Sequence, residues 1–190
     1  MPAQYPSFGE IRDVQRKLTE MKKQYYFHHD LFSIQWWLLV ALMIVSWMVW
    51  WKIVDKSRVR EILLYGAVLS VVIIMLDDIG SELGLWSYPY QAIPLIPRLN
   101  AIDLSVLPVF HMIVYQYYKS WKSFLAANAV MALSFAFIAE PLFVWLDIYH
   151  MENWRYIYSI PLYIAKALFV RWLLEFIQAK ASVKQQRLIK

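Results

Sequence analysis

The feature that most constrains the fold is a run of 21 residues without a single charge, Leu31–Trp51. As one helix this run crosses the roughly 30 Å hydrocarbon core of a bilayer. Tryptophan pairs lie near both of its ends, where membrane helices commonly carry aromatic anchors. We therefore predict an all-α, polytopic membrane helix bundle. Its five transmembrane helices are expected at about Leu31–Trp51, Ile62–Ile79, Ala101–Tyr118, Ser123–Leu146 and Tyr156–Ile177.

Composition supports a membrane protein. Hydrophobic residues make up 61% of the 190 positions and charged residues 17%, against about 45–50% and 25% in soluble domains. The sequence has no cysteine, which excludes disulfides, thiolate metal sites and thiol catalysis. The net charge of +5 favours attraction to anionic lipid headgroups over nucleic-acid binding. No cleavable signal peptide is expected, because the first 30 residues are charged and have no apolar core.

The N-terminal segment predicts an amphipathic helix. Ser7 and Glu10 have the spacing of a capping box, and an apolar stripe with basic neighbours follows. Such a helix either lies in the headgroup region or binds a protein partner. We expect an amphipathic helix over residues 1–30, a five-span membrane domain over 31–180 and a basic tail over 181–190. The apolar stripe is Ile11, Val14, Leu18, Met21 and Tyr25.

Loop charge predicts the orientation of the bundle. Lys and Arg are concentrated in the loop after the first span and in the loop after the third. The positive-inside rule then puts these loops and the C-terminus in the cytoplasm and the N-terminus outside. The basic N-terminal helix disagrees with this assignment. The stretch Gly80–Asn100 contains two glycines and three prolines, so we expect a re-entrant segment or a lid there.

Ionisable residues within the predicted spans are the candidate functional residues, because a charge at the centre of a membrane helix costs about 2.5–3.5 kcal/mol. Counted at about 1.5 Å per residue from the predicted outer ends, they lie at most roughly 15 Å deep. This predicts one polar cavity that opens to the extracytoplasmic side. Glu140 is the strongest candidate for a general acid, because Pro141 disrupts the helix beside it. The candidate catalytic residues are Glu140, Asp78, Asp103, Asp77 and His111.

Aromatic residues near these acids predict the cavity wall. The sequence has 10 Trp, 13 Tyr and 10 Phe, and aromatic faces stabilise cations. The same residues also fit interfacial belts or an inert helix bundle. Lys166 is expected to neutralise Glu140 or an aspartate. The candidate substrate-binding residues are Trp86, Tyr88, Tyr115, Phe137, Trp145, Tyr163 and Lys166.

Several short motifs resemble a family of small multi-span membrane proteins of endospore-forming bacteria. They are Asp77 with Gly84–Pro89, Asp103 with Leu107–Val109, Tyr115–Tyr117, Trp121-Lys122, Glu140-Pro141, and Trp154 with Tyr158-Ser159. The resemblance implies a bacterial cell membrane and a link to sporulation, but no activity. A looser likeness of layout connects the chain to integral-membrane terpene and lycopene cyclases.

Three functions remain open from the sequence. The first is an acid-initiated cyclase or isomerase that acts on a lipid-soluble, isoprenoid-like molecule and needs no cofactor or metal. The second is a small proton-coupled transporter, and the third a non-catalytic structural or partner-binding membrane subunit. Chemistry on a diphosphate is disfavoured. Asp77, Asp78 and Glu82 depart from the spacing of a DDxxD motif, and only Arg98 and Arg155 are nearby to hold phosphates.

Overall fold

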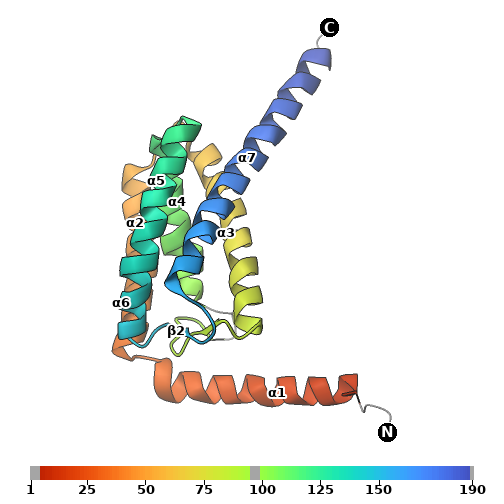
Figure 1. The fold of residues 1–190 in the computed structure, drawn as a ribbon, viewed down its shortest axis with the longest axis vertical. Coiled ribbons are helices and arrows are strands. Elements are labelled where there is room, and N and C mark those ends of the chain that lie inside the picture. The colour runs from red at the N-terminus through yellow and green to blue at the C-terminus, as the bar shows by residue number, and fades with distance from the viewer. Residues whose placement is uncertain (1–4, 95–98, 189–190) are drawn as a thin grey trace.

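The computed structural model describes residues 5–94 and 99–188, with side chains up to residue 181. It is all-helical apart from two short strands, with 79% of its residues in helices. The helices pack side by side as a bundle, and α1 runs across one end of that bundle (Figure 1). The helical elements are α1 (Phe8–Tyr25), η1 (Tyr26–Asp30), α2 (Ile34–Ile53), α3 (Val59–Glu82), η2 (Ile102–Val106), α4 (Leu107–Tyr117), α5 (Trp121–Ser134), η3 (Phe135–Ala139), α6 (Glu140–Trp145) and α7 (Tyr156–Leu188).

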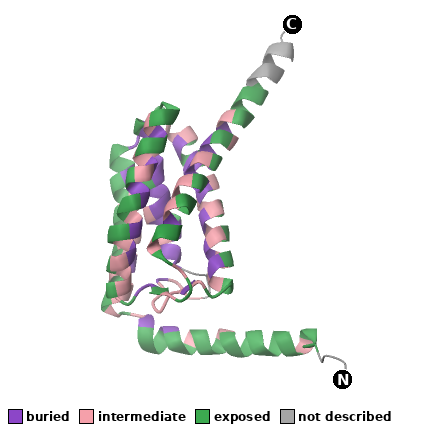
Figure 2. Cartoon of the chain, in the orientation of Figure 1, coloured by how far each residue is buried: buried purple, intermediate pink, exposed green. Residues whose placement is uncertain are grey.

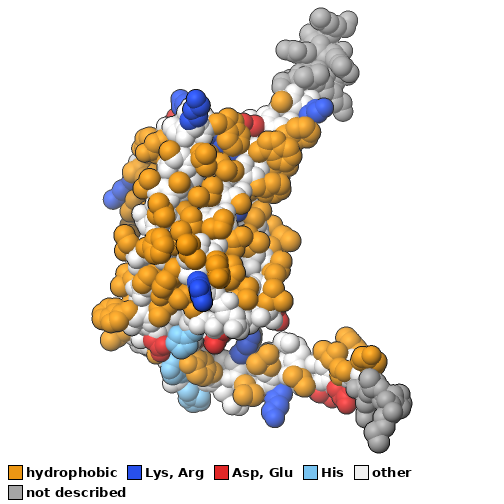
Figure 3. Space-filling model, viewed as in Figure 1, with side chains coloured by type: hydrophobic (Ala, Val, Ile, Leu, Met, Phe, Trp, Pro, Cys, Tyr) orange, Lys and Arg blue, Asp and Glu red, His pale blue; other side chains and the backbone are white. Residues whose placement is uncertain are grey.

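Three helices are long and apolar enough to cross a membrane: Ile34–Ile53, Val59–Glu82 and Trp121–Trp145. The last combines α5, η3 and α6. The sides of the bundle are covered mainly by hydrophobic side chains, and Lys and Arg gather at its ends (Figure 3). The bundle is therefore apolar on the outside as well as in its core, which is the pattern of a helix bundle in lipid. The predicted tail over 181–190 does not begin as a separate element, because α7 runs on to Leu188.

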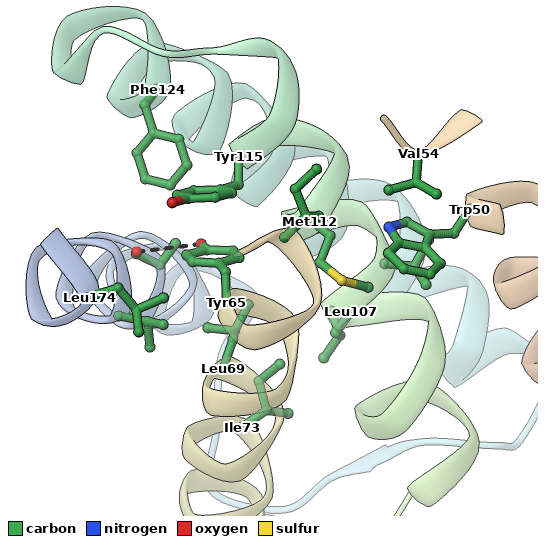
Figure 4. Packing of buried hydrophobic residues seen from close by; sticks show 14 residues of the cluster. Trp50, Val54, Tyr65, Leu69, Ile73, Leu107, Met112, Tyr115, Phe124 and Leu174 are labelled. Carbon is green, nitrogen blue, oxygen red and sulfur yellow. Dashed lines mark hydrogen bonds between the residues drawn. The ribbon is translucent and has the colours of Figure 1, made fainter. Parts of the chain in front are cut away.

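Aromatic stacking and one close helix contact build the core of the bundle. The rings of Tyr65 and Tyr115 stack with 4.2 Å between their centroids, and Phe124 packs edge-on against both (Figure 4). At Gly66 a Cβ atom would lie 2.4 Å from the sulfur of Met112. The glycine therefore lets α3 and α4 approach closely. Buried residues run through the centre of the bundle, whereas α1 is exposed on nearly all sides (Figure 2).

Two π-helical turns, η2 and η3, each lead directly into a proline. In η2 the amide of Leu107 bonds to the carbonyl of Ile102, and in η3 the amide of Glu140 bonds to that of Phe135. Pro108 has no N–H to offer the carbonyl of Leu104, and Trp47 Nε1 donates to this carbonyl instead, at 3.1 Å. π-Helical turns of this kind are frequent at functional sites.

Residues 83–94, here named the lid, cross the end of the bundle. The α3 helix stops in a Schellman-type turn, with Gly84 at φ +64° and the amide of Leu85 bonded to the carbonyl of Gly80. The chain then forms β1 (Trp86–Ser87), which pairs antiparallel with β2 (His150–Met151). Residues 83–94 of the predicted segment Gly80–Asn100 thus cross the bundle end, residues 95–98 lie outside the described residues, and the re-entrant alternative stays a prediction.

Residues at the junction between α1 and α2 form hydrogen bonds with the lid. Tyr26 Oη donates to the carbonyl of Ala92 at 3.1 Å, and Trp36 Nε1 donates to the same carbonyl at 3.0 Å. The buried carboxylate of Asp30 accepts the amide of Gln91 at 3.2 Å and contacts His29 at 3.0 Å. Burial raises the pKa of Asp30, and these two bonds oppose the shift. The N-terminal helix is thus tied to the segment that closes the bundle.

Candidate functional site

A cavity of about 160 Å³ lies where α3, η2, α6 and α7 meet beneath the lid. Four of the predicted ionisable residues line it: Asp77, Asp103, Glu140 and Lys166. They come from four different helical segments, and each is at least nine-tenths buried. The structure therefore brings together groups that are up to 89 residues apart in the chain, from Asp77 to Lys166.

Asp77 is held by the lid. Trp86 Nε1 donates to Asp77 Oδ1 at 2.8 Å, and Tyr88 Oη donates to the same oxygen at 2.5 Å. Gly80 makes room for this arrangement, because a Cβ atom there would lie 2.1 Å from the Trp86 ring. Asp103 lines the cavity beside these groups, and its charge interacts with that of Asp77. Among the described residues, no side chain donates a hydrogen bond to Asp103, so it lacks the donors that stabilise the ionised form of Asp77.

Glu140 has a different set of partners, all neutral donors from or near α7. Tyr163 Oη donates to Oε1 at 2.9 Å, and Ser159 Oγ donates to Oε2 at 3.1 Å. Trp154 Nε1 donates in turn to Ser159 Oγ at 2.9 Å, which fixes the hydroxyl proton toward Glu140. Donors on both oxygens stabilise the carboxylate form.

Lys166 is buried, with 7% of its surface exposed. Its ammonium lies over the ring of Tyr163, 4.4 Å from the centroid. Among the side chains that the structure describes, it forms no hydrogen bond and no ion pair. Its charge interacts most strongly with Asp103, then with Asp77 and Glu140. Ser159 and Tyr163, and not Lys166, donate to the oxygens of Glu140, and the expectation that Lys166 neutralises Glu140 or an aspartate stays a prediction.

Aromatic residues form much of the remaining wall. Of the predicted substrate-binding set, Trp86, Tyr88, Tyr163 and Lys166 line the cavity. The wall also contains aromatic residues that sequence reasoning did not select: Phe135, Phe143, Tyr149 and Trp154.

Three predicted aromatic residues lie elsewhere. Phe137 and Trp145 are 54% and 79% exposed on the outside of the bundle. Each is two residues away from a lining residue, Phe135 or Phe143, and two positions along a helix correspond to about 200°. Tyr115 lies toward the opposite end of the bundle, where its hydroxyl donates to Glu61 at 2.8 Å.

Two predicted catalytic residues also lie outside the cavity wall. Asp78 follows Asp77 on α3 and so projects about 100° away from it; it makes other contacts. His111 is fully buried one helical turn beyond Leu107, which is a lining residue. His111 Nδ1 lies 2.8 Å from the carbonyl of Leu107, and this bond satisfies one ring nitrogen within α4.

The sequence-based selection of site residues did not include Ser159. It forms one helical face with Tyr163 and Lys166 at positions i, i+4 and i+7, so the spacing on α7 contained the signal. Trp154 and Tyr149 carried no such signal, because they enter the cavity from the non-helical chain between α6 and α7. Within the described residues, no group of His, Asp and Glu side chains is arranged to hold a metal ion.

Comparisons with known proteins give no identity. No known protein family, no curated protein and no solved structure matches this chain.

Proposed function

We propose that the protein is a five-span membrane protein with α1 on the bilayer surface. Two further helices, α4 with η2 and α7, run alongside the three apolar ones in the same bundle (Figure 1). The exposed apolar stripe of α1 and its position across the bundle end support an interfacial helix. The loops rich in Lys and Arg at the end opposite the lid favour a cytoplasmic position for that end.

Within this arrangement we propose an acid–base catalyst, a cyclase or isomerase, for a lipid-soluble molecule. One observation carries the proposal: of the three carboxyl groups around a single aromatic-walled cavity, Asp77 and Glu140 each accept two hydrogen bonds, whereas no described side chain donates one to Asp103. Sites that use one carboxyl as acid and another as base depend on such a difference.

The hydrogen bonds suggest the role of each group. Asp77 accepts two donors, which favours its ionised form, whereas Asp103 accepts none from the described side chains and so keeps its proton more readily. Asp103 is then the proton donor, and the neighbouring charge of Asp77 favours its protonated form. Glu140, which accepts two donors, suits the role of base or stabiliser of positive charge. This reverses the sequence-based preference for Glu140 as the acid.

The proposed reaction needs no co-reactant. Asp103 transfers its proton to the substrate and becomes a carboxylate, and the substrate becomes a cation that the aromatic faces stabilise. Glu140 then removes a proton from a neighbouring carbon, and the electron pair of that C–H bond forms the new double bond. Return of this proton from Glu140 to Asp103 completes an isomerisation with no net gain or loss of atoms.

The test is proton exchange with solvent. The purified protein in nanodiscs that contain a bacterial lipid extract is incubated in D₂O, and apolar lipids are analysed by mass spectrometry. The wild type is expected to incorporate deuterium, and Asp103→Asn to lower the rate about 100-fold or more. Glu20→Gln, at an exposed carboxylate on α1, is the matched control and should leave the rate unchanged. A wild type that incorporates no deuterium contradicts the proposal.

A non-catalytic membrane subunit is the second candidate. The observation in its favour is that the same hydrogen bonds hold elements together: Asp77 binds the lid to α3, and Glu140 binds α6 to α7. For such a subunit the wild type would exchange no deuterium. Glu140→Gln would then have its main effect on the melting temperature.

A further inference from the structure

Lys166 is the group in the cavity that the proposed reaction does not use. It is more than nine-tenths buried, it lines the cavity, and its ammonium has no hydrogen-bond acceptor among the described side chains. Burial of an ammonium without an acceptor is unfavourable. The nearby carboxyl groups and the face of Tyr163 at 4.4 Å offset part of this penalty. An occupant of the cavity that offers an acceptor would remove the rest.

The charges around Lys166 restrict that acceptor. Asp103, Asp77 and Glu140 all interact with its ammonium through space. The described wall contains three carboxyl groups and one cationic side chain, Lys166. An anionic ligand would add to this excess, so a carboxylate or phosphate is disfavoured. A neutral oxygen accepts a hydrogen bond without adding charge.

The size of the cavity restricts the ligand further. A volume of about 160 Å³ is close to that of apolar cavities that bind benzene. It therefore holds a head of about six to eight non-hydrogen atoms, and the rest of a long apolar molecule would lie outside it. The walls contributed by Leu76, Val106 and Leu162 are apolar, so they suit a carbon skeleton on either side of one oxygen.

We infer that the ligand of this cavity is a lipid-soluble molecule with one neutral oxygen, a carbonyl or an ether-type oxygen, which accepts a hydrogen bond from Lys166. Asp103 lines the same cavity as Lys166, and their charges interact, which makes the oxygen that Lys166 binds the candidate atom for protonation by Asp103. This inference rests on the proposed function, since it names the substrate class of that site. Pure hydrocarbons are thereby disfavoured as substrates.

Binding of a matched pair of ligands tests the inference. The probes are farnesylacetone, an isoprenoid ketone, and the hydrocarbon in which a CH₂ group replaces its carbonyl. Native mass spectrometry of the protein released from detergent micelles measures the bound fraction of each over a concentration series. The wild type is expected to bind the ketone about tenfold more tightly, as a hydrogen bond from a charged donor provides. Lys166→Met should reduce this ratio to about one.

Two further variants keep the result interpretable. Lys166→Gln retains an N–H donor and should keep part of the preference for the ketone. Lys180→Met makes the same change at an exposed position on α7 and should keep all of it. Equal binding of both ligands by the wild type overturns the inference, and so does an unchanged preference in Lys166→Met. An adduct lighter than the intact ketone complex by one water also overturns it, because the amine would then have attacked the carbonyl.

The two proposals fail in different ways. If the wild type prefers the ketone and Lys166→Met does not, but no deuterium is incorporated, the oxygen site stands and the catalytic proposal fails. If deuterium is incorporated and neither protein distinguishes the ligands, the catalytic proposal stands and the oxygen site fails.

Discussion

The two ends of the bundle treat buried charge in opposite ways. At the end opposite the lid, the half-buried Arg58 and the buried Arg171 each have an anion in contact. Arg58 Nη2 lies 2.9 Å from Glu61 Oε1, and Arg171 Nε lies 2.8 Å from Glu175 Oε1. At the lid end, Lys166 has no such contact among the described side chains, and the side chains seen to donate to Asp77 and Glu140 are neutral. Complete pairing braces a structure, whereas incomplete pairing around a cavity leaves room for a ligand.

The largest expected effect is the loss of stability on substitution of Arg171. Arg171 binds Glu175 and the carbonyls of Tyr118 and Lys119, so it fastens the turn between α4 and α5 to α7. Arg171→Met leaves these acceptors without a donor and should lower the free energy of unfolding by about 3 kcal/mol. Circular dichroism in detergent should then show a melting temperature lower by roughly 10 °C.

The control for this prediction is Lys180→Met, which removes an exposed cation from the same helix and should leave the melting temperature unchanged. If Arg171→Met and Lys180→Met have the same melting temperature, the contacts of Arg171 do not stabilise the end opposite the lid. The proposed difference between the two ends is then wrong.

The next effect concerns the lid. Gly80→Ala places a Cβ atom 2.1 Å from the present position of the Trp86 ring, so the indole must move and its bond to Asp77 is lost. Such overpacking costs about 1–3 kcal/mol. The near-ultraviolet circular dichroism band of the displaced tryptophan should weaken together with the melting temperature.

Gly9→Ala is the matched control for the lid variant. The nearest atom to a Cβ there is Ser7 Oγ at 3.8 Å, so the added methyl group meets no steric obstacle. Unaltered spectra in Gly80→Ala would show that the lid does not depend on the packing of Trp86 against Gly80 of α3.

Helix positions were largely predictable from the sequence, because they coincide with long apolar runs. The predicted span Ile62–Ile79 lies within α3, Val59–Glu82. The depths of the ionisable residues predicted one polar cavity, and Asp77, Asp103, Glu140 and Lys166 line the cavity of the structure. Which side of a helix faces the cavity was less predictable. Phe135 and Phe137 have nearly the same predicted depth in the membrane, so depth does not indicate which of them faces the cavity. Neither π-helical turn has a strong signature in the sequence.

Contacts made by non-helical chain could not be predicted. Trp86 and Tyr88 reach Asp77 only because the Schellman-type turn and the β1–β2 pair set the path of the lid. The ion pairs at the end opposite the lid were not predicted for another reason. Arg171 and Glu61 lie near the ends of their apolar runs, where charged residues are ordinarily solvated.

The smallest expected effect is also the sharpest contrast with Arg171→Met. Lys166→Met removes a cation that is just as buried, 7% exposed against 6% for Arg171, but that has no ion pair to break among the described side chains. The methionine side chain fills a similar volume, and the neighbouring acids can take up a proton to compensate for the lost charge. Without ligand, the free energy of unfolding should therefore change by less than about 1 kcal/mol in either direction. A loss as large as that of Arg171→Met would instead make Lys166 a brace, and the lid end would then not differ from the basic end.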